Sequence, residues 1–97
     1  MIQSFKNTGC EDIFNGLKTK EARKICPVRL WSIIARKLDQ LDSVTKLDDL
    51  RRPPGNRLEM LSGGNKRQYS VRINDQYRIC FCWTDSGPDE VEILDYH

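Results

Sequence analysis

The amino-acid sequence predicts an α+β domain, in which N-terminal helices pack on one face of a mainly antiparallel, twisted sheet of about four strands. Two patterns predict it. In the first half of the chain, apolar residues recur every three or four positions, as in amphipathic helices. From residue 57 onward apolar and polar residues alternate, as in strands with one buried face. The 97 residues fit one domain, 1–97, with a modest core.

The first half of the chain holds the predicted helices. Residues 2–5 are an apolar stretch that we interpret as a short first strand. A first helix begins over residues 9–12, because the acidic side chains there favour a helix N-terminus. A second, amphipathic helix of about 14–16 residues begins at Pro27, since proline suits the first helical position. One face of this helix is apolar and consists of Leu30, Ile33, Ile34, Leu38 and Leu41.

A proline-rich connector separates the helices from the sheet. Thr45 is predicted to cap a short helical turn that ends at Leu50. Residues 51–56 are predicted to be stiff and non-helical, because prolines lack N–H donors and restrict the residues before them. The alternation that follows predicts strands at residues 57–61, 69–73, 77–83 and 91–94.

The parity of the apolar positions predicts how the strands pair. Matching apolar faces on the two middle strands requires an odd loop, the shortest being residues 74–76, which places Arg72 opposite Arg78. A turn over residues 85–89 then places Tyr96 opposite Arg78. With Glu59 opposite Arg72, the predicted helix-free face carries a polar row: Glu59, Arg72, Arg78 and Tyr96, with His97 next in the chain.

This row has two interpretations. It is either a surface Glu–Arg ion pair beside an unrelated arginine, or a binding site for a phosphate group. Two arginines opposite each other repel and destabilise a sheet, which favours the phosphate, since each guanidinium can bind it bidentately. The added carboxylate, phenol and imidazole match general acid–base cleavage of RNA, whose own 2′-OH is the nucleophile.

The chain end supplies protonatable groups. Asp95, Tyr96 and His97 follow an apolar strand-like run that would anchor them, and His97 is the only histidine. The pKa of an imidazole lies nearest neutral pH among the side chains, so His97 suits proton transfer. The alternative is a polar tail that only solubilises the C-terminus.

Charge is divided unevenly along the chain, although the net charge is only +2. Residues 18–37 carry seven basic side chains and one acidic one, a net +6, and residues 51–78 carry a net +5. Residues 79–97 carry five acidic side chains and neither Lys nor Arg. This segregation predicts a polyanionic partner, although a solvated lysine face on a helix explains part of residues 18–37.

Other classes of protein are disfavoured by the sequence. The four cysteines have no C-x-x-C spacing and no histidine nearby, so we expect reduced structural thiols and neither a metal site nor a cofactor. No apolar run is long enough to span a membrane. The N-terminus has no signal-peptide pattern, so a cytoplasmic location is expected.

Three blocks of sequence resemble HigB-type toxins of the RelE/ParE superfamily: RPPGNRLE at 52–59, SVRINDQYRICF at 70–81 and VEILDYH at 91–97. The resemblance covers nearly the whole chain and implies a RelE-like fold. It also implies the toxin of a bacterial type II toxin–antitoxin pair. Such toxins are ribosome-dependent mRNA endonucleases that cut in the ribosomal A site without a metal, leaving a 2′,3′-cyclic phosphate and a 5′-hydroxyl.

The resemblance implies roles for individual residues. Arg72 and Arg78 would hold the scissile phosphate. Asp95, Tyr96 and His97 match the family's catalytic cluster, in which Tyr96 would orient the substrate and His97 would act as acid or base. Some HigB-type members have a histidine at the position of Glu59, so the general base is either Glu59 or His97. Candidate contacts to mRNA or ribosomal RNA are Arg51, Arg52, Arg57, Lys66 and Arg67.

The resemblance also implies partners. These are a HigA-type antitoxin with a helix-turn-helix domain, the 70S ribosome with its mRNA, and operator DNA through the toxin–antitoxin complex only. Residues 18–37 are a candidate docking site for the antitoxin. Two alternatives stay open: a ParE-like gyrase inhibitor, which needs no proton-handling terminus, and a non-catalytic nucleic-acid-binding module. The module would lose affinity gradually as arginines are removed, whereas a nuclease would lose rate sharply.

Overall fold

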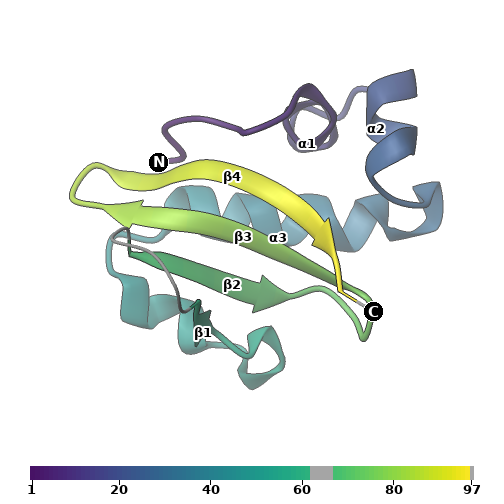
Figure 1. Ribbon diagram of the computed structural model, residues 1–97. Helices are drawn as coiled ribbons and strands as arrows, with labels where there is room; N and C mark the ends of the chain where they lie inside the picture. The colour runs from purple at the N-terminus through teal and green to yellow at the C-terminus, as the bar shows by residue number, and fades with distance from the viewer. Residues whose placement is uncertain (62–66, 97) are drawn as a thin grey trace.

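The computed structural model describes residues 1–61 and 67–96. It confirms the predicted fold class, with helices on one face of a four-stranded antiparallel sheet of order β1-β2-β3-β4 (Figure 1). The helices are α1 (Thr8–Phe14), α2 (Lys20–Ile25) and α3 (Trp31–Ser43), with 3₁₀ turns η1 (Val28–Leu30), η2 (Leu47–Arg51) and η3 (Pro54–Asn56). The strands are β1 (Glu59–Met60), β2 (Gln68–Arg72), β3 (Tyr77–Thr84) and β4 (Gly87–Asp95).

The long helix α3 covers the sheet and carries the predicted apolar face. It begins later than predicted, because Pro27 has an extended backbone and precedes η1, so the α-helix starts at Trp31 and runs for 13 residues. Its residues Ile34 and Leu38 are buried in one core with Ile79 of the sheet. In Figure 1, α3 lies behind the strands, and the opposite face of the sheet has no helix over it.

Three local predictions before the sheet are wrong. Residues 2–5 form no strand, and only Phe5 makes a parallel bridge, to Val91 of β4. Thr45 is not a cap, since η2 follows Lys46 and has no side-chain cap. Residues 51–56 include the end of η2 and all of η3. A 3₁₀ turn tolerates proline at its start, where the missing N–H has no partner to lose.

The central hairpin pairs as predicted. β2 and β3 place Arg72 opposite Arg78 and Val71 opposite Ile79. The N–H of Ile73 donates to the carbonyl of Tyr77 (3.0 Å), so the connecting loop is residues 74–76.

Both outer strand pairs differ from the prediction by two residues. Glu59 lies opposite Ser70 rather than Arg72, and Arg78 lies opposite Leu94 rather than Tyr96. A shift by two keeps each side chain on the predicted face. Glu59, Arg72 and Arg78 therefore share the helix-free face, but as staggered neighbours and not as a single row. The first strand is also shorter than predicted, and its Met60 is 72% exposed.

A tight turn and a β-bulge cause the shift in the last hairpin. Thr84 pairs with Gly87, so the turn is Asp85–Ser86 and not residues 85–89, and the Thr84 hydroxyl donates to the Gly87 carbonyl (2.7 Å). The register then slips between Cys80 and Cys82, where Glu90 adopts a left-handed backbone with φ 51°. A parity argument assumes one residue opposite one residue, which a bulge violates.

All four cysteines are buried free thiols, as predicted. Burial raises the pKa of Cys10 from 9.0 to about 12 and that of Cys26 to about 11. In each case the fold excludes water from the sulfur and so disfavours the thiolate.

We expect the free energy of unfolding to fall as pH rises above 9. The unfolded chain releases the Cys10 proton near its ordinary pKa, whereas the folded chain holds it to about 12, so this stabilisation is complete below pH 9 and lost toward pH 12. Cys10→Ala should flatten the dependence more than the matched change Cys26→Ala. Urea unfolding at several pH values between about 8 and 11 measures the slopes. Equal slopes in wild type and Cys10→Ala would contradict the expectation.

Candidate functional site

Arg78 is held in one position on the helix-free face. Its Nε donates to the Ser70 hydroxyl (2.8 Å) and its Nη2 donates to the Arg57 carbonyl (2.7 Å). The same Nη2 lies 3.9 Å from Glu59 Oε2, and the side chain is only 11% exposed. A guanidinium fixed by neutral acceptors and one distant carboxylate keeps most of its charge available to an anion.

Ser70 is a site residue that the sequence reasoning missed. It lies between Glu59 and Cys80 in the sheet, is fully buried, and accepts from Arg78 with its hydroxyl. The signal was present in the sequence, since Ser70 is a polar residue on the same face as Arg72. Parity placed Glu59 two residues away and so hid this contact.

The connector residue Asn56 positions the carbonyl that Arg78 contacts. Asn56 is 1% exposed, and its amide donates to the carbonyls of Leu50 (3.1 Å) and Arg52 (3.2 Å) and to Gln40 of α3 (3.0 Å). Its Oδ1 accepts from Lys37 Nζ (2.6 Å). The next residue, Arg57, has a left-handed backbone with φ 43°, and its carbonyl accepts from Arg78. Asn56 therefore links helix α3 to the segment that contacts Arg78.

Arg72 lies opposite Arg78 in the neighbouring strand and is more exposed. Its Nη2 pairs with Asp75 in the hairpin loop, and the Asp75 side chain is 99% exposed. Burial lowers the pKa of Lys37 of α3, and the positive charges of Arg36 and Arg72 lower it further.

We expect Asp75→Asn to release Arg72 and to strengthen binding of single-stranded RNA up to about fivefold, because an exposed ion pair is worth at most about 1 kcal/mol. Stability should change by less than about 0.5 kcal/mol. Fluorescence anisotropy at low salt measures the affinity. Asp49→Asn makes the same charge change at an exposed position of η2. If both substitutions raised the RNA affinity equally, the gain would come from the change in net charge and not from the release of Arg72.

Tyr96 lies against the site, whereas Asp95 points to the hairpin loop. The Tyr96 hydroxyl is 3.8 Å from the Cys80 sulfur. The backbone N–H of Tyr96 donates to the Gln76 carbonyl (2.5 Å). Burial and the contact with Cys80 raise the pKa of Tyr96, while the positive charge of Arg78 acts in the opposite direction. Asp95 accepts a hydrogen bond from the Gln76 amide (3.0 Å). His97 lies outside the described residues.

Comparison with known proteins assigns the family. Residues 3–97 match the model of the HigB-like toxin family, described as the RelE-like toxin of the type II toxin–antitoxin system HigB. The chain belongs to the HigB-like toxin family. Toxin HigB-1 of Vibrio cholerae is 38% identical over 85 residues, which are 88% of this chain and 86% of that protein. An uncharacterized protein of Haemophilus influenzae is 42% identical over 71 residues, 73% and 69% of the two chains. A type II toxin has a cognate antitoxin as its partner.

Three of the remaining basic candidates, Arg51, Arg52 and Arg57, lie in or next to the connector, whereas the carbonyl of Arg67 accepts from the N–H of Trp83 in β3 (2.8 Å). Arg52, Arg57 and Arg67 are exposed, and Arg51 pairs with Asp48 at the surface (2.7 Å). Lys66 lies outside the described residues. Within residues 1–61 and 67–96, no three His, Cys, Asp or Glu side chains are grouped to hold a metal ion. No helix in that part of the chain is long and apolar enough to cross a membrane.

Proposed function

We propose that this toxin is a ribosome-dependent mRNA endonuclease, which cuts mRNA in the ribosomal A site and stops translation. One observation carries the proposal: the Arg78 guanidinium is fixed on the open face of the sheet, with Arg72 opposite in the neighbouring strand and the Tyr96 hydroxyl against Cys80, two residues along β3. Such preorganised cations stabilise the charge that develops on a phosphate during transfer.

The proposed reaction uses the 2′-OH of the mRNA as the nucleophile. The 2′-oxygen attacks the adjacent phosphorus, and its proton passes to a general base, either Glu59 or His97. Arg78 and Arg72 stabilise the added negative charge on the phosphoryl oxygens. The bond to the 5′-oxygen then breaks, and that oxygen takes a proton from Tyr96 or His97. The products are a 2′,3′-cyclic phosphate and a 5′-hydroxyl, so the protein supplies every proton transfer without a metal.

The raised pKa of Tyr96 favours an orienting role in this scheme. A phenol whose pKa lies above its ordinary value stays protonated and can donate a hydrogen bond to the substrate, but it gives up its proton less readily. Asp95 contacts the loop of residues 74–76 instead, so we propose that it holds the chain end against the hairpin.

The proposed partners follow from the family. We propose neutralisation by a HigA-type antitoxin, which brings operator DNA to the complex, and binding to the 70S ribosome and its mRNA through the exposed basic residues around the connector. For the antitoxin, residues 18–37 offer a basic surface. Charge reversal at Lys20 and Lys24, both exposed on α2, tests this surface by the affinity of the complex.

The test is primer extension on mRNA programmed into ribosomes. Wild type, Arg72→Ala and a His97 deletion are compared, with a ribosome-free control. We expect discrete A-site cuts by wild type that are lost in both variants while ribosome binding persists. A well-folded wild type that makes no cuts would refute the nuclease, and a gyrase supercoiling assay would then test the ParE-like alternative. Cuts without ribosomes would refute ribosome dependence.

A further inference from the structure

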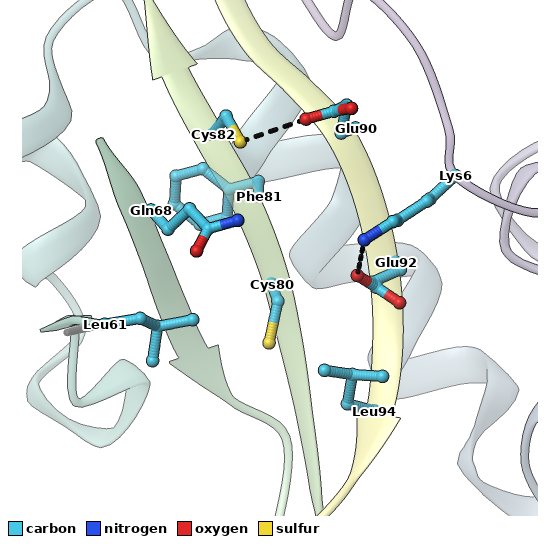
Figure 2. A pocket seen from close by; sticks show the side chains of 9 residues that line it. All are labelled: Lys6, Leu61, Gln68, Cys80, Phe81, Cys82, Glu90, Glu92 and Leu94. Carbon is cyan, nitrogen blue, oxygen red and sulfur yellow. Dashed lines mark hydrogen bonds and ion pairs between the residues drawn. The ribbon is translucent and has the colours of Figure 1, made fainter. Parts of the chain in front are cut away.

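A small cavity lies in the helix-free face beside the proposed site (Figure 2). Its volume is about 120 Å³, and its walls come from β2, β3, β4 and the segments before α1 and after β1. Pockets for drug-sized ligands measure about 300–1,000 Å³, so this cavity suits a fragment such as one flat ring system. The proposed reaction assigns no role to it.

Cys80 connects the cavity to the proposed phosphate site. Its thiol lines the cavity and lies 3.8 Å from the Tyr96 hydroxyl. Arg78 precedes Cys80 by two positions on the same face of β3, a spacing of about 7 Å. A nucleotide whose phosphate contacts Arg78 therefore has its base within reach of the cavity.

The walls of the cavity fit a base and disfavour a phosphate. Glu90 and Glu92 bring carboxylates to its rim, and Gln68 brings an amide. Lys6 pairs with Glu92 (3.2 Å), and the Cys82 thiol donates to Glu90 (3.3 Å). Carboxylates repel a phosphate, but they accept hydrogen bonds from the amino groups of bases. The aliphatic side chains of Leu61 and Leu94 supply apolar contact for the faces of a ring.

The backbone directs one of these carboxylates onto the open face. Glu90 stands at the β-bulge with φ 51°, a conformation that non-glycine residues seldom adopt. Its N–H donates to the Ser4 hydroxyl (3.0 Å), which holds the bulge against the N-terminal segment. Bulges often re-aim a side chain next to an active site.

We propose that this cavity is a subsite for a nucleobase with an exocyclic amino group, namely adenine, cytosine or guanine, of the nucleotide next to the scissile phosphate. Glu90 and Glu92 accept hydrogen bonds from the amino group, so uracil, which lacks one, is disfavoured. The inference rests on the proposed nuclease and adds a base preference to it.

Two measurements test the subsite. In the first, ¹⁵N-labelled wild type is titrated with adenosine, cytidine and uridine 3′-monophosphates. We expect the amide signals of Cys82 and Glu90 to shift with the adenine and cytosine nucleotides and to respond more weakly to the uracil nucleotide. Glu90→Gln and Glu92→Gln, which keep shape and remove charge, should abolish the difference. Asp39→Asn, at an exposed position of α3, should preserve it.

The second measurement is the cleavage profile on ribosomes programmed with all codons. Wild type and Asp39→Asn should cut codons with uracil at one position about tenfold less than codons with an amino-bearing base there, the order of one good base contact. Glu90→Gln and Glu92→Gln should lose this ratio.

The outcomes separate the two proposals. The subsite is overturned if wild type cuts with the same codon profile as Glu90→Gln and Glu92→Gln and the amide signals at the cavity do not shift. That result leaves the nuclease proposal intact. The nuclease is overturned if wild type makes no cuts. If its cavity signals still shift selectively with the amino-bearing nucleotides, the cavity is supported as a base-binding site. Shifts of equal size with all three nucleotides overturn the base preference.

Discussion

Arg78→Ala is expected to lower the rate of mRNA cleavage on the ribosome by about 10²- to 10³-fold, the usual loss when one preorganised group that stabilises transition-state charge is removed. The reason is the way in which Arg78 is held. Ser70 and the Arg57 carbonyl fix two of its nitrogens, so the cation is in place before RNA binds and needs no reorganisation. Single-turnover cleavage at saturating ribosome measures the rate.

Three variants separate catalysis from folding and net charge. Arg29→Ala removes one positive charge from an exposed position in η1 and should leave the rate unchanged. Arg78→Lys keeps the charge but loses the fork that meets Ser70 and Arg57, so it should restore only part of the rate. Ser70→Ala should also lower the rate, and Ser70→Thr should restore it by returning the hydroxyl. A folded Arg78→Ala that cuts at the wild-type rate would exclude Arg78 from the reaction.

The sequence predicted the faces of the sheet better than the contacts on them. The hairpin of β2 and β3 was predicted residue by residue, because the chain forms the shortest loop of odd length, residues 74–76, and Arg72 does lie opposite Arg78. The predicted pairing of β3 with β4 failed for local reasons. The Thr84 side chain closes a tight turn and Glu90 inserts a bulge, and neither changes the apolar pattern from which register was argued.

The contacts that position the candidate site could not be predicted from the sequence pattern, for a different reason. Asn56 acts through hydrogen bonds to residues as far away in the chain as Lys37, and composition carries no signal for such pairs. Ser70 instead contacts Arg78 across the β2–β3 hairpin, and the predicted register of Glu59 hid that contact. Tyr96 was predicted to meet Arg78 by pairing and instead lies near it by reaching back over Cys80. The sequence thus predicted that Arg72, Arg78 and Tyr96 lie on one side of the sheet, while their contacts required the fold.

Asn56→Ala is expected to lower the free energy of unfolding by about 2–4 kcal/mol, since each buried hydrogen bond contributes about 0.5–1.5 kcal/mol and Asn56 makes several. Without its amide, the buried carbonyls of Leu50 and Arg52 lose a donor, and Lys37, already partly desolvated, loses an acceptor. For a chain of this size the loss corresponds to a melting temperature lower by about 10–25 °C. Asn15→Ala, at an exposed position after α1, should change stability by less than about 0.5 kcal/mol.

Asn56→Ala should also lower activity at the candidate site. Asn56 fixes the connector on α3, and the following residue supplies the carbonyl that Arg78 contacts. Folded Asn56→Ala, assayed well below its melting temperature, should therefore cut mRNA more slowly than wild type although Asn56 faces no substrate. Adding Arg78→Ala to Asn56→Ala should then cost less in rate than Arg78→Ala costs alone, because the Arg78 cation is already misplaced. Fully additive losses of rate would mean that Asn56 stabilises the fold without positioning Arg78.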